Sequence, residues 1–389
     1  MTRGGLGAGV PNAAVEALVA DFSATAAVRD AAGGTAKRER DLIRESGLLR
    51  LSIPVELGGA GADWVETLGV VRRLASVDSS LAHVFAFHHL MLATFQFFGS
   101  PAQAQEFLRR TAQDGWFWGN ALNPRDPRTQ LQAVEGGYRL DGHKSFCSGA
   151  SDSDMIIVSA LDRETKALRV AAIPTRRDGV LVHGDWDNMG QRQTDSGTVS
   201  FDNVFVAESE LLLSPGPLGS PFASLRPCLA QLVLTNIYLG LAQGALEQAK
   251  TYLHGAPAEI RERVGQDPYA LRNFGELWVE IAAARALTDE AQRAFQQGWE
   301  AGADTTPELR GDIAVTIAAA KVASSRASVE VGSRIFDLMG ARSTAAAHRF
   351  DRFWRNARTH TLHDPLDHKL RELGSFAFEG QFPTPSFYS

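Results

Sequence analysis

The chain has 389 residues, of which 44% are hydrophobic and 22% charged, and its formal net charge is −6. This length exceeds one ordinary hydrophobic core, so two or three domains are expected, and the acidic balance gives no reason to expect a nucleic-acid partner. The two cysteines, Cys147 and Cys228, exclude a disulfide framework and favour a cytoplasmic protein.

The N-terminal part is predicted to be a helical domain over residues 1–115. Residues 1–11 are rich in glycine, lack the apolar core of a signal peptide and are expected to be disordered. Apolar residues then recur at helical spacing across 15–26 and 42–48. The segment GLLRLSIPVELGGAG breaks this pattern with proline and glycine. Helical spacing resumes beyond it and continues through the run LAHVFAFHHLMLATFQFF.

Residues 116–215 are predicted to form a small β domain. The segment VEGGYRLDGHKSFCSGA contains a Gly-Gly and an Asp-Gly turn signal, which are typical of a hairpin. MIIVSAL, LRVAAIP and GTVSFDNVFVA are short β-rich runs separated by polar turns. Strands at this spacing without helices between them indicate a small antiparallel barrel or sandwich.

Residues 216–389 are predicted to form a helical bundle. The segment SPGPLGSP is typical of a linker, and the long helical segments beyond it are rich in alanine and serine, which lets helices approach closely. The longest apolar run, residues 229–241, contains Gln231 and Asn236. A buried helix is therefore expected there, and no membrane span. The fold class is predicted to be α+β.

No local motif assigns a function by itself. The sequence contains no GxxxxGK[ST], no GxSxG and no HExxH. The segment THTLHDP places His360 and His363 three residues apart, on one face of a helix. Because no Cys or Glu-x-x-His pattern elsewhere completes a ligand set, no metal site is expected.

Three further features stay open on spacing alone. His83, His88 and His89 lie in one apolar, phenylalanine-rich helix that either lines a cavity or is ordinary core. Ser148, in FCSGA at a strand end, has no histidine near it in sequence, and these small residues suit a flat ligand or a tight turn equally. Arg342 follows a glycine that could end a helix, and it either clamps a phosphate or is solvated.

Four segments, in order, resemble the acyl-CoA dehydrogenase superfamily. GLLRLSIPVELGGAG is similar to its iPeeyGGaG segment, GYRLDGHKSFCSGASDSDMIIVSA to its β-domain hairpin, MGQRQTDSGTVSFDNVFVAESELL to its G.r.t..g.v.FddV.VP strand and RIFDLMGARST to its Q.lGG.G turn. The resemblance runs from about residue 13 to the end of the sequence. It implies an N-terminal helical domain, a small β barrel and a C-terminal four-helix bundle, with a flavin between the last two. It also implies a homotetramer in which a neighbouring subunit supplies part of each flavin site.

The segment RNARTHTLHDP points to one branch of that superfamily. Acyl-CoA dehydrogenases commonly carry a glutamate base in a YEGT-like segment after an Arg-Asp-Ala run. Here the run is Arg-Asn-Ala, the glutamate is absent, and His360, His363 and Asp364 stand in its place. The pattern is instead similar to the flavin-dependent monooxygenases of the dibenzothiophene monooxygenase type. That likeness implies reduced FMN from a separate NAD(P)H:flavin reductase, and O2 that oxygenates the substrate through a flavin hydroperoxide.

The same resemblance implies the site residues. By local motif, the catalytic residues are His88, Asn120, Ser148 and His363, with His363 as the proton donor and His88 shaping the substrate site. Because His83 and His89 are near neighbours, which of the three histidines faces the site stays open. Arg342 is expected to hold the FMN phosphate. The cofactor-binding residues implied are Asn120, Leu122, Phe146, Ser148, Trp186, Gly340, Arg342 and His360.

Two alternatives remain at this point. The chain could be an FAD-dependent acyl-CoA dehydrogenase that uses Asp364 as its base. It could also retain the fold only as a binding or assembly module, although Asn120, Ser148, His360 and His363 argue against that. The phenylalanine-rich helix favours an apolar or aromatic substrate, and the resemblance implies a small, apolar or organosulfur one, which the sequence does not identify further.

Overall fold

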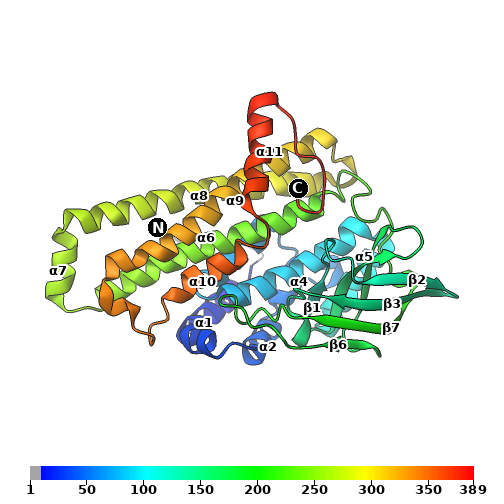
Figure 1. The fold of residues 1–389 in the computed structure, drawn as a ribbon, viewed down its shortest axis with the longest axis horizontal. Helices are drawn as coiled ribbons and strands as arrows, with labels where there is room; N and C mark the ends of the chain where they lie inside the picture. The colour runs from blue at the N-terminus through cyan, green and yellow to red at the C-terminus, as the bar shows by residue number, and fades with distance from the viewer. Residues whose placement is uncertain (1–9) are drawn as a thin grey trace.

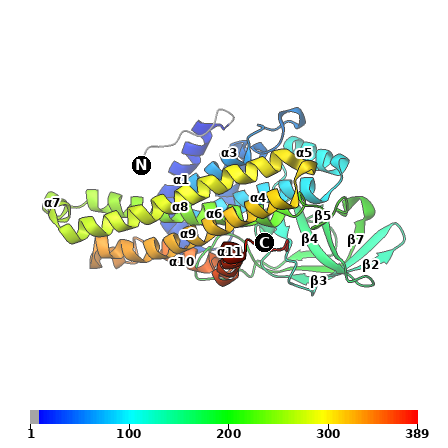
Figure 2. The same ribbon diagram turned by 90° about the horizontal axis from the view of Figure 1, so that it is seen from above.

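The computed structural model describes residues 10–389, in the order helical block, β domain and helical bundle (Figure 1). The expectation of disorder over residues 1–11 falls mostly outside the described residues, and Val10 within it is buried. The arrangement confirms the predicted α+β fold with its three parts. The sheet lies at one end of the molecule, and the long helices extend away from it side by side (Figure 2).

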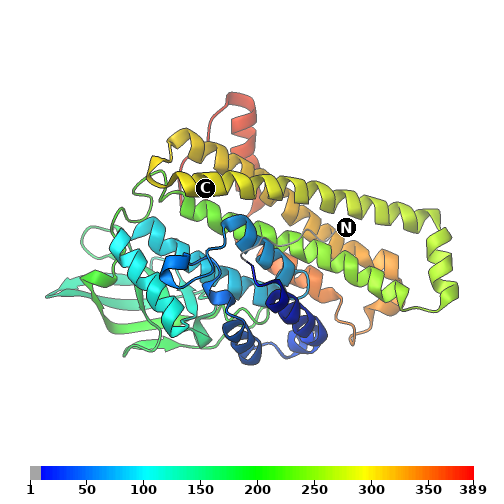
Figure 3. The ribbon, with the colours of Figure 1, turned by 180° about the vertical axis from the view of Figure 1, so that it is seen from behind.

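The N-terminal block contains five α-helices. Seen from behind, they cover the junction between the sheet and the long helices (Figure 3). Two of the five begin with a capping box, in which Asp63 pairs with Glu66 and Ser100 pairs with Gln103. The helices are α1 (Asn12–Ala32), α2 (Lys37–Glu45), α3 (Trp64–Ala75), α4 (Ser79–Phe98) and α5 (Pro101–Asp114).

The β domain is one curled sheet with its own small core of alternating inward-facing side chains. Its strands run in the order β1-β4-β2-β3-β7-β6, and β5 pairs with β4. The predicted antiparallel pairing holds for most strands, but β1 and β2 both lie parallel to β4. The strands are β1 (Trp118–Ala121), β2 (Gln130–Val134), β3 (Gly137–Lys144), β4 (Met155–Asp162), β5 (Leu168–Pro174), β6 (Val180–Val182) and β7 (Val199–Ala207).

The C-terminal part packs α6, α8, α9 and α10 as the predicted bundle, with α7 and α11 at its edges. The start of α6 and the end of α10 reach the β domain, so both can contribute to a site there (Figure 1). The helices are α6 (Leu225–His254), α7 (Ala258–Gln266), α8 (Pro268–Ala301), α9 (Pro307–Met339), α10 (Asp351–His360) and α11 (Leu366–Glu379).

Close packing joins the N-terminal block to the bundle. At Gly244 of α6, a Cβ atom would lie 1.9 Å from the carbonyl oxygen of Ser76, so only glycine lets α6 pass the end of α3. Both α4 and α6 are long and apolar enough to cross a membrane by length and composition, but 94% and 89% of their apolar windows are buried inside the protein. The two helices therefore serve as core helices of this fold.

Candidate active site

One large cavity opens where the β domain meets the helices. Its volume is about 730 Å³, which is in the range of pockets that hold cofactors and small ligands. The β domain contributes the end of β1, the turn after β3 and the loop before β7 to its wall, and the helices contribute α4, the start of α6 and the turn after α10. The cavity thus lies between elements that are far apart in sequence.

Most of the residues predicted for the flavin site meet at this cavity. Gly340 and Arg342 do not line it, because they lie in the exposed turn that follows α9. His88 does not line it either. The predicted residues that do line the cavity are Asn120, Leu122, Phe146, Ser148, Trp186, His360 and His363.

His83, and not His88, is the α4 histidine at the cavity, so the expectation for His88 is corrected. Successive helix residues turn by about 100°, which puts His83 and Phe87 on one face and His88 well away from it. His88 is completely buried, where its Nε2 donates to the carbonyl oxygen of Leu49 (2.8 Å) and its Nδ1 accepts from the amide of Trp118 (3.2 Å). It therefore ties α4 to the turn that contains Leu49, and to β1.

His88 should make the protein sensitive to mild acid. Burial lowers the pKa of its imidazole to about 4, and protonation would place a proton on Nδ1, facing the Trp118 amide. Below the unfolded-state pKa of about 6.5, the unfolded chain takes up a proton that the folded chain refuses, so stability is lost as the pH falls from 6.5 toward 4. We expect this one group to cost about 2 kcal/mol between pH 7 and pH 5.

Urea unfolding of the wild type and of His88→Gln at both pH values measures that cost. Glutamine offers an amide donor and a carbonyl acceptor but does not titrate, so the variant should lose less stability on acidification than the wild type. Equal losses in both proteins would show that His88 does not contribute to the acid sensitivity.

A chain of hydrogen bonds starts at the other face of α4. The Nδ1 of His83 lies 2.9 Å from Nε2 of His360, and its Nε2 lies 2.8 Å from Oγ of Ser148. Burial lowers the pKa of His83 to about 3 and holds the pKa of His360 well below its usual value. Both imidazoles are therefore neutral at pH 7, and each carries a single N–H.

The last acceptor in this series of hydrogen bonds determines which group donates at each step. Ser148 Oγ lies 2.8 Å from Ser196 Oγ, Ser196 donates to Thr194 (2.8 Å), and Thr194 donates to the carbonyl oxygen of Gln191 (3.0 Å). Because a carbonyl only accepts, each preceding group must donate toward it. Ser148 therefore donates to Ser196 and accepts from His83, which in turn accepts from His360. The second lone pair of the Ser148 hydroxyl stays available as an acceptor at the cavity.

The FCSGA segment forms a constrained turn that presents Ser148. Phe146 has a φ of 60°, in the left-handed region that residues other than glycine rarely adopt. The amide of Gly149 bonds the carbonyl of Thr194 (2.8 Å), and Arg40 of α2 bonds both the Gly149 carbonyl (2.9 Å) and the Asp195 carboxylate (3.0 Å). The fully buried Arg40 thus joins the two loops of the β domain that line the cavity.

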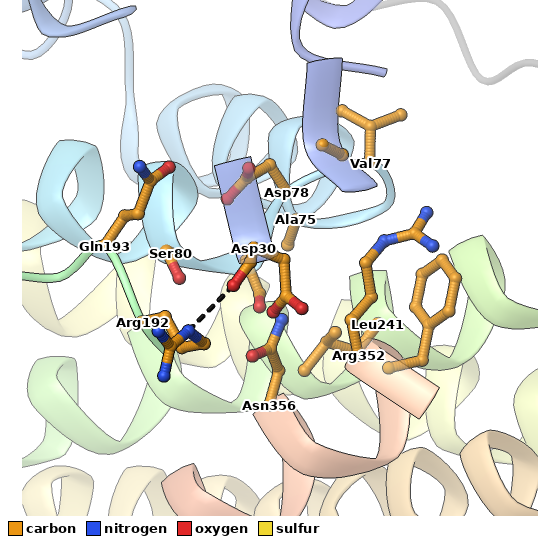
Figure 4. A pocket seen from close by; sticks show the side chains of 13 residues that line it. Asp30, Ala75, Val77, Asp78, Ser80, Arg192, Gln193, Leu241, Arg352 and Asn356 are labelled. Atoms are coloured by element: carbon orange, nitrogen blue, oxygen red, sulfur yellow. Dashed lines mark hydrogen bonds between the residues drawn. The ribbon is translucent and has the colours of Figure 1, made fainter. Parts of the chain in front are cut away.

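The Arg-Asn-Ala run of α10 is anchored to the rest of the molecule. Asn356 accepts from the amide of Gln191 (2.6 Å), and Arg355 forms an ion pair with Asp30 of α1 (2.5 Å). Figure 4 shows Asp30 and Asn356 at this junction, where Arg192 also donates to the backbone oxygen of Asp30 (2.7 Å). The pocket there is only about 10 Å³, enough for one water at most. The contacts position the helix that carries His360.

Asp364 does not face the cavity, so the expectation that it could be a dehydrogenase base is wrong. Its carboxylate pairs with Lys321 of α9 at 2.8 Å, and both side chains are 1% exposed. Lys321 also bonds the side chain of Gln231. His363, one residue earlier, points the other way: its ring lines the cavity and makes no hydrogen bond with any described residue. Although His363 is exposed at the cavity, desolvation by the surrounding protein and the charge of Lys321 lower the pKa of its imidazole.

The cavity suits a flat, polar cofactor such as a flavin. Phe146 is exposed to it and meets Trp186 edge-on at 6.2 Å, which gives an aromatic wall. Gln191, Thr359 and His360 line the cavity, and each keeps a buried polar atom that no described residue satisfies. Unpaired polar atoms of this kind are costly and typical of sites that are completed by a ligand.

Sequence reasoning missed several residues of this site. Arg40 and Arg226 belong to no motif, and Gln191 lies in the segment that begins MGQRQTDSG; none of the three was singled out as a site residue. Tyr388 lines the cavity from the last described residues of the chain, where the guanidinium of Arg125 stacks on its ring at 3.8 Å. Only long-range packing brings these side chains together, so no local signal could have identified them.

Family models match almost the whole described chain. They are the acyl-CoA dehydrogenase N-terminal domain over residues 12–114, the middle domain over 120–204 and the C-terminal domain over 232–368.

Individual relatives are also similar over nearly their full length. A probable FMNH2-dependent monooxygenase, SfnC of Pseudomonas putida, is 51% identical, over 96% of this chain and 95% of its own. The structure of methanesulfinate monooxygenase MsuC from Pseudomonas fluorescens superposes with a TM-score of 0.94 at 52% identity, covering 98% of this chain and 100% of that one. TdsC, a dibenzothiophene monooxygenase from Paenibacillus sp. A11-2 solved with FMN and indole, gives 0.92 at 40% identity over 97% and 99%.

Proposed function

Because the chain belongs to the acyl-CoA dehydrogenase family, and within it to the FMNH2-dependent monooxygenases, we propose that it oxygenates a small organosulfur compound with reduced FMN and O2. One observation carries the choice between oxygenase and dehydrogenase. At the position of the dehydrogenase base the chain presents His363 to the cavity, while the neighbouring Asp364 is buried in an ion pair with Lys321. Removal of an acyl α-proton needs a carboxylate there, and an imidazole suits proton donation to an oxygen.

The remaining lining residues divide into two groups. Asn120, Phe146, Ser148 and Trp186, together with Leu122, would hold the flavin ring from the side of the β domain. Reduced FMN, when bound, supplies the two electrons that activate O2. The aromatic and aliphatic walls exclude bulk water, which would otherwise divert the reaction. His360, through His83, orients the Ser148 hydroxyl.

Gly340 and Arg342 keep a proposed role in binding the FMN phosphate. Because both lie outside the cavity of their own chain, we propose that they complete the site of a neighbouring copy in a homotetramer. A separate NAD(P)H:flavin reductase would deliver the reduced FMN. We place the protein in the cytoplasm, in keeping with its two free, buried cysteines.

Purification followed by a reconstituted assay tests the proposal. The protein should be nearly colourless, bind reduced FMN, and oxygenate methanesulfinate or dibenzothiophene when supplied with NADH, FMN and a flavin reductase. Acyl-CoA should not reduce any bound flavin. Stoichiometric FAD together with acyl-CoA oxidation would show that the chain is a dehydrogenase. Failure to bind reduced FMN and to oxygenate either compound would favour the binding-module alternative.

A further inference from the structure

Arg226 is a buried cation with no anionic partner in the part of the chain that the structure describes. It lies in the first turn of α6, is 8% exposed and lines the cavity. Its Nε donates to the hydroxyl of Thr94 (3.2 Å), and this hydroxyl donates to the carbonyl of Leu90 (2.7 Å). Among the described residues, no carboxylate pairs with Arg226 and no acceptor meets its two Nη atoms. Because Arg226 lines the cavity, its Nη donors are available to a ligand bound there.

The hydrogen bonding and the charge compensation of the Arg226 guanidinium are incomplete. Burial of an unpaired charge is unfavourable, and proteins normally satisfy such a group with a carboxylate, a phosphate or another oxyanion. Burial also lowers the pKa of Arg226 to about 10, which shows how poorly its surroundings compensate the charge. The hydrogen bond from Nε to Thr94 leaves the two Nη groups without a described acceptor.

The charges around the cavity agree with an anionic ligand. Arg125, exposed on the loop after β1 and stacked on Tyr388, is a second lining arginine without a described carboxylate partner. The lining contains one carboxylate, Asp187, whose side chain is 93% exposed and faces Arg192. Arg125, Arg226 and His363 all line this cavity, so an oxyanion held by the two arginines would share it with that imidazole.

Part of the cavity wall near Arg226 is apolar and can contact a short alkyl group. Leu90 of α4 and Ala230 and Leu234 of α6 line the cavity beside it. A ligand that satisfies both parts is small, carries an oxyanion at one end and is apolar at the other. This chemistry distinguishes a sulfinate from the uncharged thiophenes and sulfides that the proposed reaction would also accept.

We infer that Arg226 selects the substrate by binding the oxyanion of a small alkanesulfinate, and that Arg125 covers the anion at the cavity mouth. The inference rests on the proposed monooxygenase function. The balanced reaction is R–SO2⁻ + O2 + FMNH2 → R–SO3⁻ + FMN + H2O. One oxygen atom forms a new bond to sulfur, the O–O bond breaks, and the other oxygen leaves as water with two hydrogens from the reduced flavin.

The test compares Arg226→Met, Arg226→Lys and a control, Arg109→Gln, which removes an exposed arginine of α5 paired with Glu106. The wild type should prefer methanesulfinate to dibenzothiophene. In Arg226→Met, kcat/KM for methanesulfinate should fall about 100-fold or more, mainly through KM, with dibenzothiophene turnover and FMN affinity retained. Arg226→Lys should lose less, because it keeps the charge but not the fork, and Arg109→Gln should match the wild type.

Calorimetric titration with methanesulfonate measures anion binding at the Arg226 subsite without turnover, because methanesulfonate cannot be oxidised in this way. Binding to the wild type and its loss in Arg226→Met support the inference even if no substrate is oxygenated, so failure of the subsite and failure of the proposed function are distinguishable. Equal loss of both substrates, unchanged methanesulfonate binding, or a wild-type preference for dibenzothiophene would each overturn the inference. Weakened binding of FMN with unchanged binding of riboflavin would assign Arg226 to the flavin phosphate instead.

Discussion

Replacement of His363 with alanine is expected to turn the protein from an oxygenase into an oxidase that releases hydrogen peroxide. The ring lines the cavity and makes no hydrogen bond with any described residue, so its removal breaks no described hydrogen bond and loses only the ring contact with Tyr388 at 6.4 Å. A positioned general acid typically contributes 100-fold to 10,000-fold to a reaction step. Product formation should therefore fall at least about 100-fold while NADH and O2 are still consumed.

Three measurements decide this expectation. A peroxidase-coupled assay measures the peroxide, chromatography measures the oxygenated product, and titration measures the affinity for reduced FMN, which should stay within about twofold of the wild type since His363 holds no other group. His368→Ala, which removes an exposed histidine of α11, is the matched control and should remain coupled. Unchanged product per NADH in His363→Ala would remove this residue from the mechanism.

Replacement of Lys321 with methionine should give the largest loss of stability. Lys321 and Asp364 form an ion pair that is almost wholly inaccessible, and the second carboxylate oxygen of Asp364 has no described partner. Burial outweighs the attraction of Asp364 and lowers the pKa of Lys321 to about 8. Removal of one member of such a pair leaves a buried charge alone, which costs about 3–5 kcal/mol.

The double variant Lys321→Met with Asp364→Leu separates stability from positioning. Because neither charge remains, most of the lost free energy of unfolding should return, as measured in urea. The turn after α10 would still lose the contact that holds it to α9, so coupling of NADH use to product should remain lower than in the wild type. If Lys321→Met alone lowers the free energy of unfolding by less than about 1 kcal/mol, Lys321 and Asp364 are not strongly coupled.

The sequence was most informative where the signal is local. Helical periodicity, hairpin turns and the Pro-Gly-rich linker predicted the order of the three parts, because each reflects how a short segment buries its own apolar face. The pairing of β1 and β2 parallel to β4 was not predictable in this way. A parallel register depends on how distant segments meet in the sheet.

The site shows the same division. Asn120, Ser148 and His363 were found from motifs, and the structure brings all three to the cavity. His88 was chosen in place of His83 because the two are close in sequence, and only the neighbours of α4 determine which face is enclosed. The sequence alone could not rule out Asp364 as a catalytic base, because it does not reveal that Lys321, 43 positions earlier, is its ion-pair partner.

Different segments of the chain form the two sides of the cavity wall. Substrate specificity could therefore change on one side while the other stays the same. The β domain supplies the side proposed to face the flavin, where Arg40 joins its two lining loops, while α6 and the last described residues supply Arg226 and Tyr388. Mutations in the latter segments can exchange one organic sulfur compound for another without altering the groups that manage oxygen. A change of substrate on such a scaffold therefore requires only a few substitutions on one side of the cavity.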